Sequence, residues 1–222
     1  RRFGELEYSR QAAQHFGTDH QEIIIEPQLT SILPTLVRYY GEPFADPSAV
    51  PTFYISQETR RSVTVALAGD GGDELFSGYR VYDQMQLVAR AHPWLHPFNP
   101  VFRRLNRLST DKASKRFLPR WLRFLAIGSD SLDSVFPALR CNYYSALKER
   151  LFSAEFKEAV NMDAARMRYQ EEFDASEATE FLDRILDADT RFKLPYVYLH
   201  KVDIASMANS LEVRVPFLDR RI

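Results

Sequence analysis

A glycine-rich turn that also carries carboxylates is the segment of this chain best suited to chemistry. Residues 69–79 read Gly-Asp-Gly-Gly-Asp-Glu-Leu-Phe-Ser-Gly-Tyr and follow the apolar run 63–68. Glycines let a backbone turn sharply and bring its N–H groups close to an anion. An apolar run, a glycine turn and a helix start, in that order, indicate a nucleotide site of an α/β protein.

The negative charge of this turn indicates a metal ion. It contains Asp70, Asp73 and Glu74 and no lysine, so it is not a Walker A loop, which needs G-x-x-x-x-G-K-S/T. Carboxylates repel phosphate unless a divalent cation lies between them, and oxygen-rich sites near phosphates suit Mg²⁺. The turn therefore predicts a Mg²⁺–nucleotide site, with Glu74 expected mainly to cap or charge the helix that follows.

Composition narrows the class of protein. The chain has 222 residues, 45% of them hydrophobic, and a net charge of -1, which suits one domain, or one domain with a helical annex. The near-zero charge argues against a dedicated nucleic-acid binder. Cys141 is the only cysteine, as is typical of a reducing, cytoplasmic compartment. No apolar run approaches the ~20 residues that span a bilayer. A start without methionine predicts a piece of a longer protein.

The elements that must position the turn follow from hydrophobic periodicity. Strands over 21–26 and 63–68, with a helix between them, predict a βαβ crossover and a parallel sheet. Two strands are too few for an independent sheet, so we expect further strands upstream. Pro34 is expected to kink its helix or delay its start. The helices predicted in this part cover 5–16, 28–40 and 51–61.

From residue 80 onward the pattern predicts helices and no further strand. We therefore predict part of an α/β nucleotide-binding domain over 1–79, a helical annex over 80–198, and a segment returning to the active site over 199–222. The predicted helices of this part lie near 80–91, 98–108, 114–127, 130–139, 142–151, 154–160, 163–174, 176–189 and 198–208.

Three further features of the helical part could bind ligands. Basic residues cluster between Arg103 and Arg123, and acidic residues between Glu171 and Asp189. The basic cluster could bind RNA or phosphate, but solvated faces are the favoured interpretation of both clusters. His92 and His96 have the spacing of helical zinc ligands, yet a proline follows each, which argues against a regular helix, and no third ligand is evident.

Four segments, taken in order, carry a resemblance to a known family. They are 41–52 (Gly-Glu-Pro-Phe-Ala-Asp-Pro-Ser-Ala-Val-Pro-Thr), 66–79, 201–208 (Lys-Val-Asp-Ile-Ala-Ser-Met-Ala) and 210–219 (Ser-Leu-Glu-Val-Arg-Val-Pro-Phe-Leu-Asp). Together they resemble the synthetase domain of glutamine-hydrolysing asparagine synthetases, in particular the long bacterial forms with a helical insertion. The resemblance covers essentially the whole chain. It implies an α/β fold of the adenine nucleotide hydrolase (ATP pyrophosphatase) type, here a partial parallel sheet with a large helical annex.

The resemblance also implies an activity. Members of the family convert aspartate, ATP and ammonia from glutamine into asparagine, AMP and pyrophosphate through a β-aspartyl-adenylate, with Mg²⁺ neutralising the leaving pyrophosphate. The implied partners are small substrates and a glutaminase domain of the parent chain, without nucleic acid or membrane, and a homodimer is one assembly to test. The glutaminase cysteine, the Ser-Gly-Gly-x-Asp-Ser pyrophosphate loop and a later catalytic lysine are absent from this sequence. We therefore expect this chain alone not to make asparagine.

Roles in the glycine turn come from the resemblance. Asp70 matches an acidic catalytic position, where a base beside the incoming amine is a plausible role. Asp73 matches a carboxylate that holds Mg²⁺. The residues expected to contact ATP are Ala68, where the family commonly has serine, Gly69, Gly71 and Gly72.

Residues outside the turn are expected on the acyl-substrate side. Glu212 (catalytic) and Arg214 (substrate-lining) would border the aspartyl-adenylate site, and two-residue spacing lets them point the same way on an extended segment. The alternative is a buried ion pair that docks the helical annex; Lys201 and Asp203 carry a similar ambiguity. The loop with Asp46 and Ser48 lines the acyl side, and residues 39–59 hold no Lys, Arg or His. A cation that grips aspartate must then come from elsewhere, with Arg80 and Arg214 as the candidates.

Two other classes of function stay open at this point. The same adenylating domain could close an amide ring or amidate another acid, as in β-lactam synthetases or peptide-cyclising relatives, because fold does not fix function. Asp70 favours ammonia chemistry, since ring-forming members tend to replace the acidic residue. A non-catalytic scaffold module is the third hypothesis, and the retained carboxylates of the turn argue against it.

Overall fold

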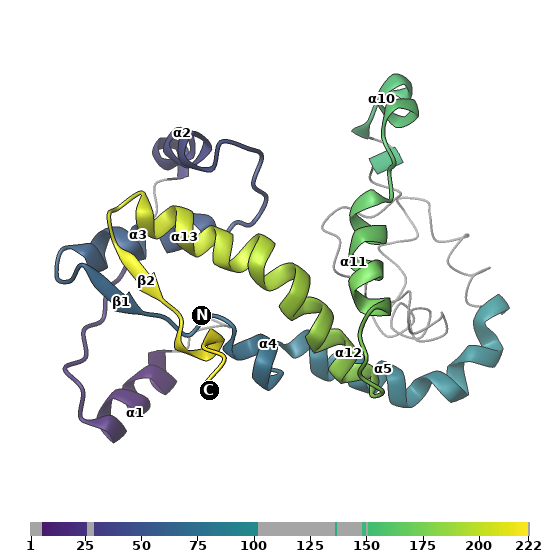
Figure 1. Ribbon diagram of the computed structural model, residues 1–222, viewed down its shortest axis with the longest axis horizontal. Helices are drawn as coiled ribbons and strands as arrows, with labels where there is room; N and C mark the ends of the chain where they lie inside the picture. The colour runs from purple at the N-terminus through teal and green to yellow at the C-terminus, as the bar shows by residue number, and fades with distance from the viewer. Residues whose placement is uncertain (1–5, 26–28, 102–135, 137–147, 150, 222) are drawn as a thin grey trace. The chain divides into compact units, whose positions relative to one another are not determined.

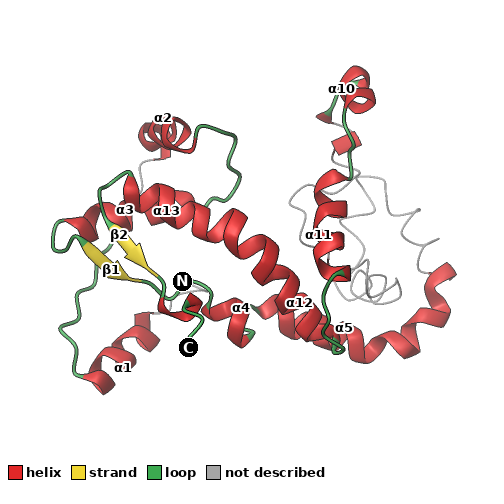
Figure 2. Cartoon of the chain, in the orientation of Figure 1, coloured by secondary structure: helices red, strands yellow, loops and turns green. Residues whose placement is uncertain are grey.

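The computed structural model describes residues 6–25, 29–101, 136, 148–149 and 151–221 (Figure 1). The chain divides into two compact units. Unit 1 comprises residues 1–67 and 201–214, and unit 2 comprises residues 68–200 and 215–222. Helices dominate the described residues of both units, as the colouring by secondary structure shows (Figure 2).

Unit 1 holds a short parallel pair of strands and several helices. Strand β1 (Val65–Leu67) pairs with β2 (Glu212–Arg214), with Val65 opposite Glu212 and Leu67 opposite Arg214. Glu212 N also donates to Thr64 O over 2.9 Å, which extends the pairing by one bond. The helices are α1 (Leu6–Phe16), α2 (Leu29–Tyr40), α3 (Ala49–Arg60) and most of α13 (His200–Met207).

The prediction of a strand over 21–26 is wrong. Residues 21–25 form no strand, and Ile24 is 89% exposed. A strand needs a hydrogen-bonding partner, and the partner of β1 is β2, so the predicted βαβ crossover is also wrong. The prediction of no strand after residue 79 fails at β2, because three residues are too short to show an alternating pattern.

Helices α2 and α3 supply the core of unit 1. Helix α3 begins after Ser48, with Pro51 in its first turn as predicted. Helix α2 contains Pro34 in its interior and still starts at Leu29, so this proline does not delay the start. The buried residues that pack together are Ile32, Leu36, Tyr40, Ala49, Val50, Phe53 and Ala205.

The regular elements that the structure describes in unit 2 are all helical. Helix α5 (Arg80–Leu95) runs past Pro93 and is followed by the 3₁₀ turn η1 (His96–Phe98), so the expectation of an irregular backbone at His92 is wrong. Pro93 lies in the last turn of α5, where its missing N–H removes one hydrogen bond and little helix follows. Further elements of unit 2 with described bounds are α4 (Gly72–Phe76), α10 (Ala154–Ala159) and α11 (Ala164–Asp174).

The predicted helix over 176–189 starts late and changes type. Helix α12 (Phe181–Ala188) passes directly into a π-helix, η3 (Asp189–Leu199), which leads into α13 without a break. The 3₁₀ turn η4 (Pro216–Leu218) follows β2. The helices predicted at 114–127, most of those at 98–108, 130–139 and 142–151, and the basic cluster lie outside the described residues. Within the described part, no helix is both long enough and apolar enough to cross a membrane.

The core of unit 2 brings α5, α11 and α12 together around aromatic side chains. Phe173 is fully buried, its ring lies against Phe181 with centroids 6.0 Å apart, and the Arg184 guanidinium lies 4.2 Å from its centroid. The cluster comprises Tyr82, Met85, Val88, Phe136, Tyr169, Phe173, Ile185 and Ala188.

Candidate functional site

The glycine turn follows β1 in the chain and is closed by its own backbone. Gly72 N donates to Gly69 O over 3.1 Å, so this N–H is used within the turn. Gly71 has a φ of +84°, a left-handed conformation that favours glycine. A Cβ on Gly71 would also lie 2.8 Å from Leu218 Cδ2. Gly71 is therefore required both by its backbone angle and by the side chain that packs under the turn.

The carboxylates of the turn are available to a ligand. Asp73 is exposed and Asp70 half-buried. Neither one forms a hydrogen bond or ion pair with another residue that the structure describes. Mg²⁺ in nucleotide sites is bound by one or two carboxylates together with substrate phosphates and water. The donor set of Asp70 and Asp73 fits that requirement.

The described residues contain no group of three or more His, Cys, Asp or Glu side chains that could hold a metal ion by themselves. The rings of His92 and His96 lie with centroids 5.0 Å apart, on α5 and at the start of η1. Their closeness follows from the helical spacing, and no third described ligand joins them. The described geometry thus gives no support to a zinc site.

Glu74 lies in the first turn of α4 and in the protein interior, and its expected effect on the helix N-terminus stays a prediction. Its side chain is 1% exposed, and its Oε1 has no partner among the described residues. Burial raises the pKa of Glu74 above its usual value, and a hydrogen bond with Tyr79 offsets this only in part. Burial also raises the pKa of Tyr79. Glu74 is thus a buried acid next in sequence to the exposed carboxylate of Asp73.

A second buried acid of unit 2, Asp189, escaped the sequence analysis. It lies at the start of η3 and is fully buried. Its two carboxylate oxygens accept hydrogen bonds from Tyr82 Oη at 2.8 Å and from Tyr169 Oη at 2.7 Å. The sequence placed Asp189 at the end of an acidic cluster, which is typical of a solvated face. No local pattern reveals the two tyrosines, because they are 107 and 20 residues away.

In unit 1, the structure brings Asp46, Ser48 and Lys201 together. Lys201 Nζ lies 2.8 Å from Ser48 Oγ and 3.4 Å from Asp46 Oδ2. Ser48 donates to Asp46 Oδ1 from both its backbone N at 2.9 Å and its Oγ at 2.7 Å. Burial alone raises the pKa of Asp46, but the Ser48 hydrogen bonds and the Lys201 charge outweigh it, so the pKa is lowered. Lys201 is thus a cation that contacts this loop within unit 1, and the substrate-gripping roles of Arg80 and Arg214 stay predictions.

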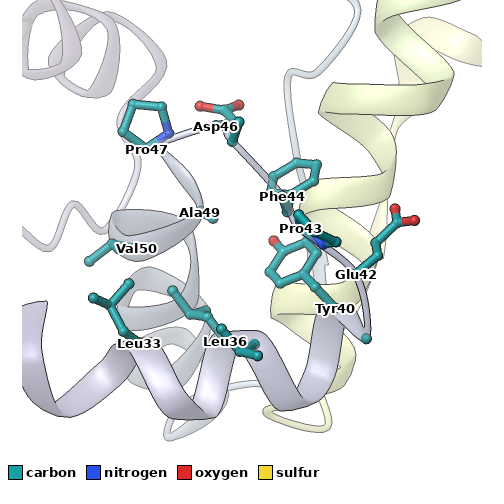
Figure 3. A pocket seen from close by; sticks show the side chains of 13 residues that line it. Leu33, Leu36, Tyr40, Glu42, Pro43, Phe44, Asp46, Pro47, Ala49 and Val50 are labelled. Carbon is teal, nitrogen blue, oxygen red and sulfur yellow. The ribbon is translucent and has the colours of Figure 1, made fainter. Parts of the chain in front are cut away.

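A cavity of about 620 Å³ lies between α2 and residues 41–50 of the same unit (Figure 3). Its wall is mostly apolar, and the rings of Tyr40 and Phe44 stack there with centroids 4.5 Å apart. Asp46 and Glu42 supply its acidic groups. Tyr40 Oη donates to Lys201 O over 3.1 Å, and burial raises the pKa of Tyr40 to about 12. The loop with Asp46 is thus held between α2 and α13.

Glu212 and Arg214 point the same way on β2, as their spacing predicted. Arg214 Nε lies 2.7 Å from Glu212 Oε1, and the side chains are 65% and 54% exposed. The alternative of a buried ion pair is therefore wrong: the pair exists, and it is open to solvent. Arg80 is the exposed first residue of α5 in unit 2. Whether the residues of the two units form one site stays a prediction.

The chain belongs to the asparagine synthase family, which it matches over residues 1–222. It is 30% identical over 230 residues to asparagine synthetase [glutamine-hydrolyzing] 1 of Bacillus subtilis, covering 98% of this chain and 33% of that protein. It is 32% identical over 224 residues to a putative asparagine synthetase [glutamine-hydrolyzing] of Mycobacterium tuberculosis, covering 99% and 32%.

A shorter match, 35% identical over 82 residues, relates 36% of this chain to 16% of a putative asparagine synthetase [glutamine-hydrolyzing] 2 of Methanocaldococcus jannaschii. The chain therefore spans about a third of the length of the curated relatives that it matches along its whole sequence. No solved structure matches it.

Proposed function

We propose that the protein to which this chain belongs makes asparagine from aspartate with ATP and an ammonia equivalent from glutamine. The reaction passes through a β-aspartyl-AMP intermediate, and a glutaminase domain elsewhere in the parent chain supplies the ammonia. The observation that carries the proposal is the pair of carboxylates, Asp70 and Asp73, that the glycine turn leaves without partners among the described residues. Family membership over residues 1–222 supports it.

The residues of the turn have distinct proposed roles. Asp73 holds Mg²⁺, which when bound supplies positive charge to the departing pyrophosphate. Asp70 accepts a proton from the incoming amine, for which a half-exposed carboxylate is suited. The backbone from Ala68 to Gly72 contacts ATP, and Glu212 and Arg214 border the acyl-adenylate. Asp46 and Ser48 line the acyl side, held there by Lys201.

The test uses the full-length parent protein with glutamine, ATP, Mg²⁺ and a panel of carboxylic acids. When aspartate is the acid supplied, asparagine, AMP and pyrophosphate should form in equal amounts. Asp73→Ala should lower kcat/KM by about 100-fold or more, the loss expected when a charge-stabilising group is removed. Formation of an amide from a different acid, or ring closure without ammonia, would contradict this proposal and would show that the protein is another amide-forming ligase.

A second arm addresses the chain by itself. We expect the isolated 222-residue chain to release no pyrophosphate from ATP in the presence of aspartate, because the pyrophosphate loop of the family is not part of its sequence. Steady ATP-dependent release of pyrophosphate by the purified chain would contradict this expectation.

A further inference from the structure

The end of helix α4 folds back onto its own first turn. Ser77 adopts a left-handed φ of 58°, and its backbone N–H donates to Asp73 O. Gly78 N donates to the same carbonyl oxygen over 2.9 Å. These two bonds bring the backbone of Gly78 against the residue that carries the outward-facing carboxylate. The contact lies entirely within unit 2 and joins residues five apart in the chain.

Because Gly78 has no side chain, the Asp73 side chain can occupy the space next to it. A Cβ built on Gly78 would overlap Asp73 Oδ1, and it would lie 2.9 Å from Asp73 Cγ and 3.1 Å from Asp73 Cα. The φ of Gly78 is not in the left-handed region, so alanine can adopt this backbone. The Asp73 carboxylate therefore occupies most of the space that a side chain at position 78 would need, and the Asp73 Cα is the next closest atom.

An added methyl group could be accommodated in two ways. The Asp73 side chain could rotate into another staggered rotamer, or the turn from Ser77 could open by a few tenths of an ångström. Both responses move the Asp73 oxygens from their present position. The neighbouring turn has no such constraint at Gly69, where a Cβ would meet nothing within 4 Å and φ is also not left-handed.

We infer that Gly78 is a positioning residue, whose missing side chain sets the orientation of the Asp73 carboxylate toward a divalent cation. The functional half of this inference rests on the proposed function, since it takes Asp73 as a Mg²⁺ ligand. The geometric half does not depend on any ligand. Gly78 itself contacts neither the metal nor the nucleotide in this scheme and acts through Asp73 alone.

The geometric half is tested by a double-mutant cycle in the 222-residue chain. Gly78→Ala should lower Tm by roughly 5 °C, the scale of one overpacked methyl group in a chain of this size. In an Asp73→Ala background, where the carboxylate is gone and only the contact with the Cα remains, the same change should lower Tm less. An equal loss of Tm in both backgrounds would overturn the inference, because Gly78 would then be required for another reason.

The functional half is tested in the full-length parent protein, by titrating Mn²⁺, as a paramagnetic substitute for Mg²⁺, into each variant with ATP present at a temperature well below Tm. Gly78→Ala should weaken Mn²⁺ binding about tenfold, as loss of a group that orients a ligand does. Tyr169→Phe, which destabilises the core of unit 2 without touching the turn, should bind Mn²⁺ as the unmodified chain does. Unchanged binding in Gly78→Ala would overturn the positioning role. Equal Mn²⁺ binding by the unmodified chain and Asp73→Ala would instead overturn the metal role of Asp73, and the functional half with it.

Discussion

At the scale of single residues, the glycine turn separates two adjacent acids by their surroundings. Asp73 is exposed, whereas the next residue, Glu74, is buried to 1% exposure. Because the two side chains leave a helix about 100° apart, neighbours in sequence face different media. Only the outward acid can offer its oxygens to a cation in solvent, and the inward one favours its neutral form.

This arrangement predicts a pH-dependent effect of removing the buried acid. The usual pKa of Glu74 is 4.5, and burial raises it in the folded state. Below about pH 4.5 the side chain is neutral in both the folded and the unfolded state and costs no stability. The free energy of unfolding then falls as the pH rises through the raised pKa of the folded state. Glu74→Gln should leave the free energy of unfolding unchanged near pH 4 and raise it by about 1 kcal/mol at pH 7, the scale of a buried polar group without a partner.

The measurement is urea unfolding of the Glu74→Gln variant between pH 4 and pH 8. Glu177→Gln, at an exposed position of unit 2, is the matched control and should show no pH-dependent difference. A stabilisation by Glu74→Gln that is the same at all pH values would mean that ionisation of Glu74 is not its cause.

At the scale of elements, Lys201 connects helix α13 to the loop before α3. Its side chain is 12% exposed and its ammonium group contacts Asp46 and Ser48, while its backbone carbonyl accepts a hydrogen bond from Tyr40 of α2. One residue of α13 thus contacts both flanks of the cavity in Figure 3. The contact gives this loop, which contains two prolines, a fixed place on its own unit.

We expect Lys201→Met to loosen this loop and to raise the pKa of Asp46 from its lowered value. The Asp46 contribution to stability is present above its usual pKa of 3.8 and is lost as pH falls through the lowered folded pKa, so the variant should unfold at higher pH during acidification. The loss of Tm at pH 7 should be roughly 5 °C, as for one charge-assisted hydrogen-bonded contact.

Amide exchange of residues 42–48 and acid unfolding curves measure both effects. Lys201→Arg keeps the positive charge and should restore part of the lost stability, whereas Lys157→Met removes an ion pair with Glu149 in unit 2 and should leave the exchange of residues 42–48 unchanged. Unchanged exchange of the loop in Lys201→Met would show that Lys201 does not hold it.

The sequence predicted helices better than strands, for a physical reason. Helix α1, α2, α3, α10 and α11 repeat a pattern over six to twelve residues, and their bounds agree with the prediction to within two residues. A strand depends on its neighbour, which sequence alone does not name. Residues 21–25 have the branched apolar residues of a strand and no partner, and β2 has a partner and only three residues.

The candidate site shows the same division between local and distant information. The glycine turn and the same-side placement of Glu212 and Arg214 follow from residue type and spacing. The contact of Lys201 with Asp46 joins residues 155 apart, and the bond from Tyr82 to Asp189 joins residues 107 apart. Those contacts depend on how the chain folds back on itself, so the sequence predicted the presence of the acids but not their partners.

At the scale of the whole molecule, the two units have separate aromatic and aliphatic cores. The core of unit 2 contains the fully buried Phe173, and that of unit 1 contains Phe53, which is 6% exposed. Cores that share no buried residue can open as separate cooperative units.

We therefore expect Phe173→Ala, which should cost about 3–5 kcal/mol, to speed amide exchange in α11 and α12 while exchange in α2 and α3 stays the same. Phe53→Ala is the reciprocal variant and should show the opposite distribution. Hydrogen exchange read by mass spectrometry measures both. If either change accelerates exchange in both units alike, the chain unfolds as one cooperative unit.

The π-helix η3 has a consequence for how this chain is compared with its relatives. Its hydrogen bonds span one residue more than those of an α-helix, so each turn takes in extra residues and shifts the phase of the helix that follows. A relative lacking one residue within 189–199 would rotate Lys201 by about 100° about the helix axis. A one-residue gap in an alignment of this region should accordingly be placed inside η3. There it changes the direction in which every residue of α13 points around the helix axis, while the connecting loops keep their length.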